Sequence, residues 1–380
     1  MPTGATSWAA VGMLAVATFV VGTSELVIAG VLPVVAGDLR ISVATAGYLV
    51  TAYAMSFAVA TPLVAAGVGG VSRRGMLVAC LAVFVVGTTL SAVAPTFEWL
   101  LASRVVTAAA AGVFEVVATA AAATLVPTSQ RGRAIALVVA GFSVALLIGV
   151  PIGTLIGNAW GWRATFGVLL APAVLVAFGI AVWLPAVPRL QPAALSVLRA
   201  PGLISALAAT GLVFCGTYIA TTFIAVLLED ISGLTPDGVA GVLLLLGLGS
   251  IVGNALGGYA IDHWGSERSS LAGGLGAALA LALLSVGAPL AGVALAACTI
   301  MGTSLGVFVP AQQARLVHIG EAAPELSLAL NLAALNAGIS LGAALGSALV
   351  DRGGLAVLGY VGAVVGLLAV ALVARTTSRT

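Results

Sequence analysis

Three charged side chains lie inside long apolar stretches, and they are the first candidates for chemistry: Glu25, Arg104 and Glu115. A charge in the middle of a membrane costs about 2.5 to 3.5 kcal/mol or more, and such a charge usually faces a wet cavity. A carboxylate beside an arginine stays ionised, whereas a desolvated carboxylate without one takes up a proton. Breaking a Glu–Arg pair would therefore couple protonation to a conformational change, which predicts proton exchange.

The positions of these residues along their helices predict which of them meet. Counted from the helix starts, Glu25 and Arg104 both fall in the outer halves of their spans, so we expect them to form a pair. A permanent ion pair that only fixes helix packing is the alternative. Glu115 follows Arg104 by 11 residues, and at about 100° per residue it returns to the same helical face, roughly 16 Å deeper. It is a candidate second proton site, or else a neutral, hydrogen-bonded acid.

Uncharged polar and aromatic side chains in the same stretches are candidates for contacting a substrate. Embedded Asn and Gln side chains also serve as interhelical hydrogen bonds, and aromatic rings also pack or anchor at interfaces. Both alternatives stay open here. The expected substrate contacts are Glu25, Tyr53, Glu115, Phe142, Tyr218, Asn331 and Asn336.

The elements that must position these groups are apolar helices that cross a membrane. Of 380 residues, 61% are hydrophobic and 7% charged, against roughly 25% charged in soluble domains, which excludes a water-soluble globule. About 20 apolar residues cross a bilayer, and continuous apolar runs indicate helices rather than barrel strands. The chain is predicted to be all-α with twelve spans: 8–36, 44–68, 76–94, 97–126, 133–157, 164–184, 202–228, 237–261, 269–288, 290–314, 326–350 and 354–374.

Arginine placement predicts the orientation, because cytoplasmic loops carry the excess of positive charge. All 14 basic residues are Arg, and together with the abundance of Ala, Gly and Val this suggests a bacterial source. One set of loops is rich in Arg and the other set poor, so we expect a bacterial inner-membrane protein with both termini in the cytoplasm. The rich set holds Arg73, Arg74, Arg131, Arg133, Arg189, Arg199, Arg268, Arg315, Arg375 and Arg379, and the poor set holds Arg40, Arg163 and Arg352.

A proline-rich stretch in the middle of the chain divides it into two halves. We predict a six-helix bundle over 1–184, a cytoplasmic linker over 185–201 and a second six-helix bundle over 202–380. Sliding the second half back by about 193 residues aligns the two Gly-x-x-x-Gly motifs that begin at Gly149 and Gly342, which indicates an internal duplication. Two such halves with a site between them are typical of secondary transporters.

Several motifs together resemble the major facilitator superfamily over nearly the whole chain. They are the first span and its turn, Gly22 to Pro33 through Asp38-Leu39; the run Gly149-Val150-Pro151-Ile152-Gly153; and Gly161-Trp162-Arg163-Ala164-Thr165-Phe166. The first span is similar to the drug and proton antiporter branch, and within it to chloramphenicol-resistance proteins and to sugar or nucleobase exporters. In span four, Ser103-Arg104 with Ala108 resembles the arginine motif, which implies a role in proton coupling for Arg104.

The same resemblance supplies candidates for gating. The loop after span two keeps Arg73 and Arg74 but lacks the acidic residue usual there, whereas the loop after span eight has Asp262 and Arg268. Asp262 is expected to cap a helix start or to pair with Arg268. Pro151 removes a backbone hydrogen bond within the stripe of glycines at 149, 153 and 157, which predicts a bend. The gating candidates are Arg73, Arg74, Gly149, Pro151, Gly153, Asp262 and Arg268.

Missing motifs and a near-neutral charge narrow the function. With no Lys there is no phosphate-binding loop, so transport driven directly by ATP is excluded at the level of motifs. No nucleophile elbow or metal-spaced Cys and His set is present, and the formal charge of +2 offers no nucleic-acid surface. We expect no enzyme activity, cofactor, metal or nucleic acid. The expected partners are a small molecule, protons and the lipid bilayer, with the protein acting as a monomer.

These observations predict proton-coupled efflux of a small, mostly apolar, drug-like compound such as chloramphenicol. An exporter of sugars, nucleobases, nucleosides or another small metabolite is the alternative. A membrane-embedded enzyme would need a clustered nucleophile and base, and a channel would need neither duplicated halves nor embedded charges.

Overall fold

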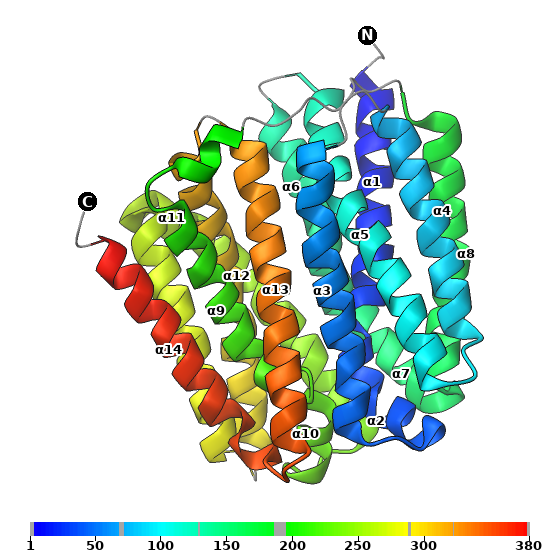
Figure 1. The fold of residues 1–380 in the computed structure, drawn as a ribbon, viewed down its shortest axis with the longest axis vertical. Helices are drawn as coiled ribbons and strands as arrows, with labels where there is room; N and C mark the ends of the chain where they lie inside the picture. Colours follow the sequence, from blue (N-terminus) through cyan, green and yellow to red (C-terminus); the bar gives the residue numbers. More distant parts are fainter. Residues whose placement is uncertain are drawn as a thin grey trace.

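A computed structural model describes residues 4–67, 72–127, 130–185, 195–287, 290–321 and 323–377, and over these ranges the chain is helical with no β-strand. The helices form two bundles side by side (Figure 1). The first bundle contains α1 Gly4–Leu26, α2 Ile28–Leu39, α3 Val43–Gly67, α4 Arg73–Ala92, α5 Phe97–Leu125, α6 Arg131–Val144, α7 Val150–Trp160 and α8 Trp162–Trp183. The second contains α9 Leu203–Thr221, α10 Ile224–Asp230, α11 Pro236–Gly287, α12 Ala291–Ile319, α13 Pro324–Val350 and α14 Leu358–Thr377.

The number of membrane crossings agrees with the prediction when the two arms of α11 are counted separately. The described residues contain 11 helices long and apolar enough to cross a membrane. One of them, α11, is 52 residues long and changes direction at Gly265, where φ is 81° and ψ is 160°. A left-handed φ suits glycine because it has no Cβ. The two arms of α11 therefore make separate crossings, and the predicted twelve-span, all-α architecture is confirmed.

Three of the predicted spans are interrupted helices. Span one breaks at Val27, between α1 and α2, and span seven breaks at residues 222–223, between α9 and α10. In span five, residues Ala145–Gly149 form a π-helical segment directly before Pro151. Proline has no N–H to donate to the carbonyl four residues earlier, and a wider π turn accommodates that loss. A π-helical segment thus ends two residues before Pro151, and the bend expected at this proline stays a prediction.

Glycine stripes bring helices into close contact, as their spacing predicts. A Cβ added at Gly149 would collide with the Thr23 side chain of α1, and one added at Gly253 would collide with the backbone of Thr303 in α12. Likewise, a Cβ added at Gly342 of α13 would collide with the Cys215 carbonyl of α9. Span five thus packs on span one as span eleven packs on span seven, and the two bundles are pseudo-symmetric.

The predicted boundary between the two bundles lies partly outside the described residues. Residues 186–194 of the predicted linker, 185–201, lie outside the described residues. The domain bounds 1–184 and 202–380 therefore stay a prediction. Contact between the bundles is extensive where α3 of the first lies against α13 of the second (Figure 1).

Apolar contacts join the two bundles at the end of the molecule opposite the N-terminus, the lower end in Figure 1. There, Leu32 and Ala46 of the first bundle share one buried cluster with Ile219 and Phe223 of the second. A cluster toward the N-terminal end contains buried residues of the first bundle only, with partly buried Leu332 against it. The described apolar packing therefore closes the bundle interface mainly at the lower end.

Candidate functional site

Helices α1 and α5 bring the three embedded charges into the middle of the first bundle. The 29-residue helix α5 begins at a Thr96 cap, whose hydroxyl accepts a hydrogen bond from the Trp99 amide at 3.4 Å. Arg104 lies two turns into this helix and has no exposed surface. Glu115 lies further along α5, and Glu25 lies near the end of α1.

Neutral groups hold the Arg104 guanidinium. Its Nη1 donates to the Ser24 hydroxyl at 3.3 Å, and its Nη2 donates to the backbone carbonyl of Glu25 at 3.2 Å. The Cζ atom lies 4.1 Å from the centroid of the Tyr53 ring and 5.6 Å from that of Phe166. Both distances lie within the range of cation–π attraction.

The expected side-chain ion pair between Glu25 and Arg104 is not formed. Among the described residues, no carboxylate oxygen lies within 4.0 Å of an Arg104 nitrogen. The contact uses the Glu25 backbone instead because α1 ends at Leu26, and the last carbonyls of a helix lack intrahelical donors. The two residues meet, as predicted, but through a helix end.

The two acidic side chains keep oxygens without hydrogen-bond partners. Glu25 Oε2 and Glu115 Oε1 are both buried and unpaired among the described residues, although each side chain as a whole is partly exposed. The two carboxyl groups are close enough to interact electrostatically with each other and with Tyr53. Tyr218, from α9 of the second bundle, lies within the same range of Glu25. The site therefore extends across the bundle interface.

Other expected substrate contacts take different positions. Tyr218 stacks on Phe214 with ring centroids 6.4 Å apart. The Phe142 ring lies against Gly22 of α1, which matches the packing alternative. Asn331 accepts a hydrogen bond from the Thr210 hydroxyl at 2.7 Å, so it links α13 to α9.

Asn336 lies on the face of α13 that meets the first bundle. Its amide nitrogen donates to the Leu332 carbonyl at 3.2 Å, and its buried Oδ1 has no partner among the described residues. One turn further on, the Ser340 hydroxyl donates across the interface to the Thr51 carbonyl of α3 at 3.0 Å. The Thr51 hydroxyl is also buried without a described partner.

The gating candidates divide into buried and exposed groups. Arg73 donates to the Ala120 carbonyl at 3.0 Å. Arg74 donates to two carbonyls at the end of α8, that of Ala181 and, at 3.0 Å, that of Leu184. These arginines tie α4 to α5 and α8. Residues 68–71 of the loop before them lie outside the described residues.

In the second bundle the gating prediction needs a correction. Asp262 and Arg268 both have exposed side chains, and no ion pair or cap joins them in the described structure. The ion pair in this region connects Glu267 to Arg315 of α12 at 3.4 Å. Gly265 separates the predicted partners with a change of chain direction, which a spacing in sequence does not show.

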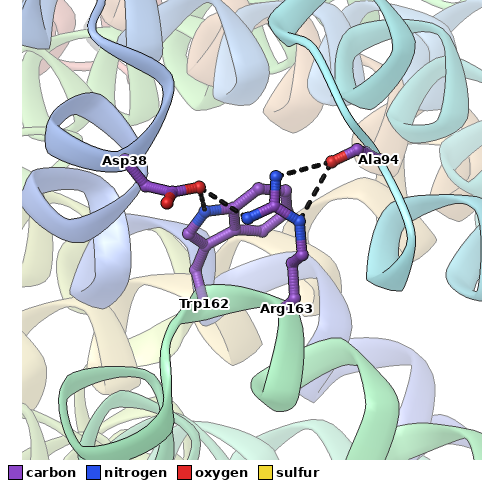
Figure 2. A network of polar contacts seen from close by, with 4 residues as sticks. All are labelled: Asp38, Ala94, Trp162 and Arg163. Atoms are coloured by element: carbon purple, nitrogen blue, oxygen red, sulfur yellow. Dashed lines mark hydrogen bonds and ion pairs between the residues drawn. The ribbon is translucent and has the colours of Figure 1, made fainter.

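A polar network at the lower end was missed as a site, although its residues belong to the motifs noted above (Figure 2). Asp38 Oδ2 accepts from Trp162 Nε1 at 3.0 Å and from Arg163 Nη1 at 2.5 Å. Arg163 also donates twice to the Ala94 carbonyl, from Nε at 3.0 Å and from Nη2 at 2.8 Å. The hydrogen bond from Arg163, and next that from Trp162, hold the pKa of Asp38 below its usual value. The network ties α2, the α4–α5 loop and α8 together.

A second missed network lies inside the second bundle. Gln312 Nε2 donates to the Ala206 carbonyl at 2.6 Å, and Gln312 Oε1 accepts from the Ser270 hydroxyl at 3.0 Å. The amide thereby joins α12 to α9 and α11. The type of Gln312 is visible in the sequence, but only the fold reveals its partners.

Comparison with known proteins places the chain among transporters. The family model described as Major Facilitator Superfamily matches residues 14–323 and 209–380. The uncharacterized MFS-type transporter YbcL of Bacillus subtilis is 33% identical over 94% of this chain and 93% of its own length. A chloramphenicol resistance protein of Streptomyces lividans is 37% identical over 69% of each chain.

A solved structure supports the fold independently of sequence. The xylose transporter XylE from E. coli, in a partially occluded inward-open conformation, superposes with a TM-score of 0.76 over 98% of each chain, at 14% identity. At that identity the likeness concerns the arrangement of helices only.

Proposed function

The chain belongs to the major facilitator superfamily, and from that premise we propose that it exports a small, mostly apolar, drug-like compound such as chloramphenicol in exchange for protons. Transport across a membrane follows from the family. The observation that carries proton exchange is that two embedded acids, Glu25 and Glu115, each keep a buried carboxyl oxygen without a described partner, in the bundle that also buries Arg104.

The geometry suggests how a proton and a substrate would alternate. A carboxyl group inside a membrane that lacks a cation partner is neutralised by binding a proton. Arg104 is held by Ser24, the Glu25 carbonyl and Tyr53, and it acts on the Glu25 carboxyl group electrostatically without a direct hydrogen bond. In the proposed cycle, protons bind Glu25 and Glu115 when the site opens outward and leave when it opens inward. Substrate moves in the opposite direction.

The remaining parts of the cycle are proposed from the fold. Rocking of one bundle against the other would open and close the site. The π-helical segment before Pro151 is the proposed flexible part of span five, and the Arg73 and Arg74 contacts the proposed gate on the arginine-rich side. We place the protein in a bacterial inner membrane, with both termini in the cytoplasm, as a monomer.

The substrate class is proposed from the relatives and from the lining. The Streptomyces lividans relative is called a chloramphenicol resistance protein. Aromatic rings lie in the same region: Tyr53 and Phe166 beside Arg104, and Tyr218 stacked on Phe214. Such rings suit a largely apolar molecule.

A more polar substrate is the second candidate. Asn336 Oδ1, the Thr51 hydroxyl and the Tyr53 hydroxyl are buried without described partners on α3 and α13. Groups of this kind suit a sugar, nucleobase, nucleoside or similar metabolite with several hydrogen-bonding positions.

Uptake of labelled chloramphenicol into inverted, energised vesicles tests the proposal. Wild-type protein should accumulate the drug, and a protonophore should abolish accumulation. Glu25→Gln and Glu115→Gln each remove a titratable group with little change of shape, so each should reduce the protonophore-sensitive uptake by at least tenfold. Glu98→Gln is the matched control, because Glu98 is an exposed acid on the same helix as Glu115.

Three outcomes would count against the proposal in different ways. Normal pumping by both glutamine variants would remove the acids from the mechanism. Uptake that ignores the protonophore would remove proton coupling. A well-inserted wild-type protein that accumulates no chloramphenicol, but exchanges a labelled nucleoside or sugar for protons, would favour the second candidate.

A further inference from the structure

The Tyr53 ring occupies the place beside Arg104 where a carboxylate was expected. Arg104 is fully buried, and it forms no hydrogen bond or ion pair with a carboxylate among the described residues. A buried cation needs compensating groups, and an aromatic face supplies negative potential without a formal charge. The Tyr53 ring centroid is 4.1 Å from the guanidinium carbon, closer than that of Phe166 at 5.6 Å.

The other end of the same side chain is unused. Tyr53 is 2% exposed, and its hydroxyl has no hydrogen-bond partner among the described residues. A buried phenol normally finds a partner, since an unmade hydrogen bond is costly. An acceptor that becomes available in another state of the protein would satisfy it.

The neighbours of Tyr53 supply such an acceptor. The charged groups that act on it are Glu25 from α1 and Arg104 and Glu115 from α5, while Tyr218 of α9 faces Glu25 from the other bundle. Helix α13 also packs against α3, and its residues 326–350 carry no charged side chain. In α2, Asp38 is already paired with Arg163. Among the charged groups that act on Tyr53, the two embedded glutamates are the ones that can accept a hydrogen bond.

Tyr53 is also close to a contact between the bundles. Two residues before it on α3, the Thr51 carbonyl accepts the Ser340 hydroxyl of α13 at 3.0 Å. A change in the position of Tyr53 would be passed along the rigid helix to this contact. The same helix thus borders the charged site and the moving interface.

We propose that Tyr53 is a positioning residue for proton exchange and not a substrate contact. Its ring holds Arg104 in place, and its hydroxyl donates to the Glu25 carboxylate once that group has lost its proton. The inference rests on the proposed function, because it assigns a role within the proton-exchanging site. It replaces the substrate contact expected for Tyr53 from sequence.

Two substitutions separate the hydroxyl from the ring. Tyr53→Phe keeps the ring and removes the donor, so the ionised acid loses a stabilising hydrogen bond and keeps its proton to higher pH. The pH at which the export rate is half-maximal should rise. The proton concentration at that pH should be lower by about threefold to tenfold, as loss of one such hydrogen bond implies. The substrate KM should change by less than twofold. Tyr53→Leu also removes the ring and should lower the export rate by more than tenfold.

Tyr48→Phe is the matched control, since Tyr48 lies on the same helix and is 41% exposed. Its pH profile should coincide with that of the wild type. An unchanged profile for Tyr53→Phe would overturn the inference, and a raised substrate KM without a shift would make Tyr53 a substrate contact instead. Failure of the proposed function is distinguishable, because wild-type export would then be insensitive to a protonophore.

Discussion

The two bundles share their packing and differ in their charge. Helices α5 and α12 both have 29 residues, and aligning their first residues sets Arg104 opposite Cys298 and Glu115 opposite Val309. The offset of 193 residues that aligns Gly149 with Gly342 likewise sets Glu25 opposite Tyr218. Every embedded charge of the first bundle thus has an uncharged counterpart. The duplicated fold provides a framework, and one half of it carries the ionisable groups.

The embedded acids of the first bundle and two amides of the second differ in how far their hydrogen bonds are satisfied. In the second bundle, Gln312 has partners at both ends of its amide, and Thr210 is bonded to Asn331. In the first, Glu25 and Glu115 each keep a buried oxygen without a described partner. Satisfied networks fix helix positions, whereas unsatisfied ionisable groups can change state. In the proposed cycle, proton exchange therefore belongs to the first bundle, and these amides of the second anchor its helices.

Replacing Arg104 by Ala should have the largest effect on export of the substitutions considered. The change strands the Ser24 hydroxyl and the Glu25 carbonyl and leaves a void against Tyr53. We expect drug export in vesicles to fall by about 100-fold, or about 3 kcal/mol at 1.4 kcal/mol per factor of ten. Arg104→Lys should restore little, because a point charge does not reproduce the planar contacts of a guanidinium.

Arg199→Ala is the control for loss of one positive charge, because Arg199 is exposed in a short helical turn of the predicted linker. It should export normally. Membrane insertion and monodispersity in detergent would be measured for all variants. Near-normal export by a folded Arg104→Ala protein would show that the buried guanidinium does not control the cycle.

Hydropathy and motifs predict the helices and the embedded charges, because the cost of placing polar groups in lipid leaves a clear pattern in sequence. They do not predict how the charges are partnered. The expected ion pair of Glu25 with Arg104 depends on where α1 ends, and a break at one residue, Val27, turned the contact to the backbone. Such breaks are too short to alter hydropathy averaged over a span.

In the second bundle, too, the sequence does not predict which charged residues pair. Asp262 and Arg268 match a family pattern, but the pair that forms is Glu267 with Arg315, from the successive helices α11 and α12. The Figure 2 network was within closer reach of prediction. Asp38 ends one helix and Trp162 begins another at the same end of the bundle, so their types and positions were compatible.

Replacing Gln312 by Leu should lower the stability of the protein without changing the pH dependence of export. The variant strands the Ser270 hydroxyl and the Ala206 carbonyl in the second bundle. Interhelical hydrogen bonds in membranes average about 0.6 kcal/mol each, so we expect a loss of about 1 to 2 kcal/mol in the free energy of unfolding. The midpoint of thermal unfolding in detergent should fall, while the pH at half-maximal export should stay unchanged.

Gln313→Leu is the neighbouring control, because no hydrogen bond of Gln313 is found in the described part of α12. Its unfolding midpoint should match that of the wild type. A shifted pH profile in Gln312→Leu would contradict the assignment, since it would place proton exchange partly in the second bundle.

Replacing Asp38 by Asn should have the smallest effect and should depend on pH. Arg163, and next Trp162, lower the pKa of Asp38 in the folded protein, so its ionised form adds stability above the unfolded value of about 3.9. This contribution is lost as the pH falls through the lower, folded value. The Arg163 and Asp38 side chains are 37% and 47% exposed, which screens the pair, so we expect a difference below about 1 kcal/mol. Thermal unfolding of both proteins from pH 8 to pH 3 should give a constant gap down to about pH 4 that narrows below it. A gap that widens in acid would show that the charge of Asp38 is not what joins α2 to α8, and that the lower end of the first bundle is held by packing alone.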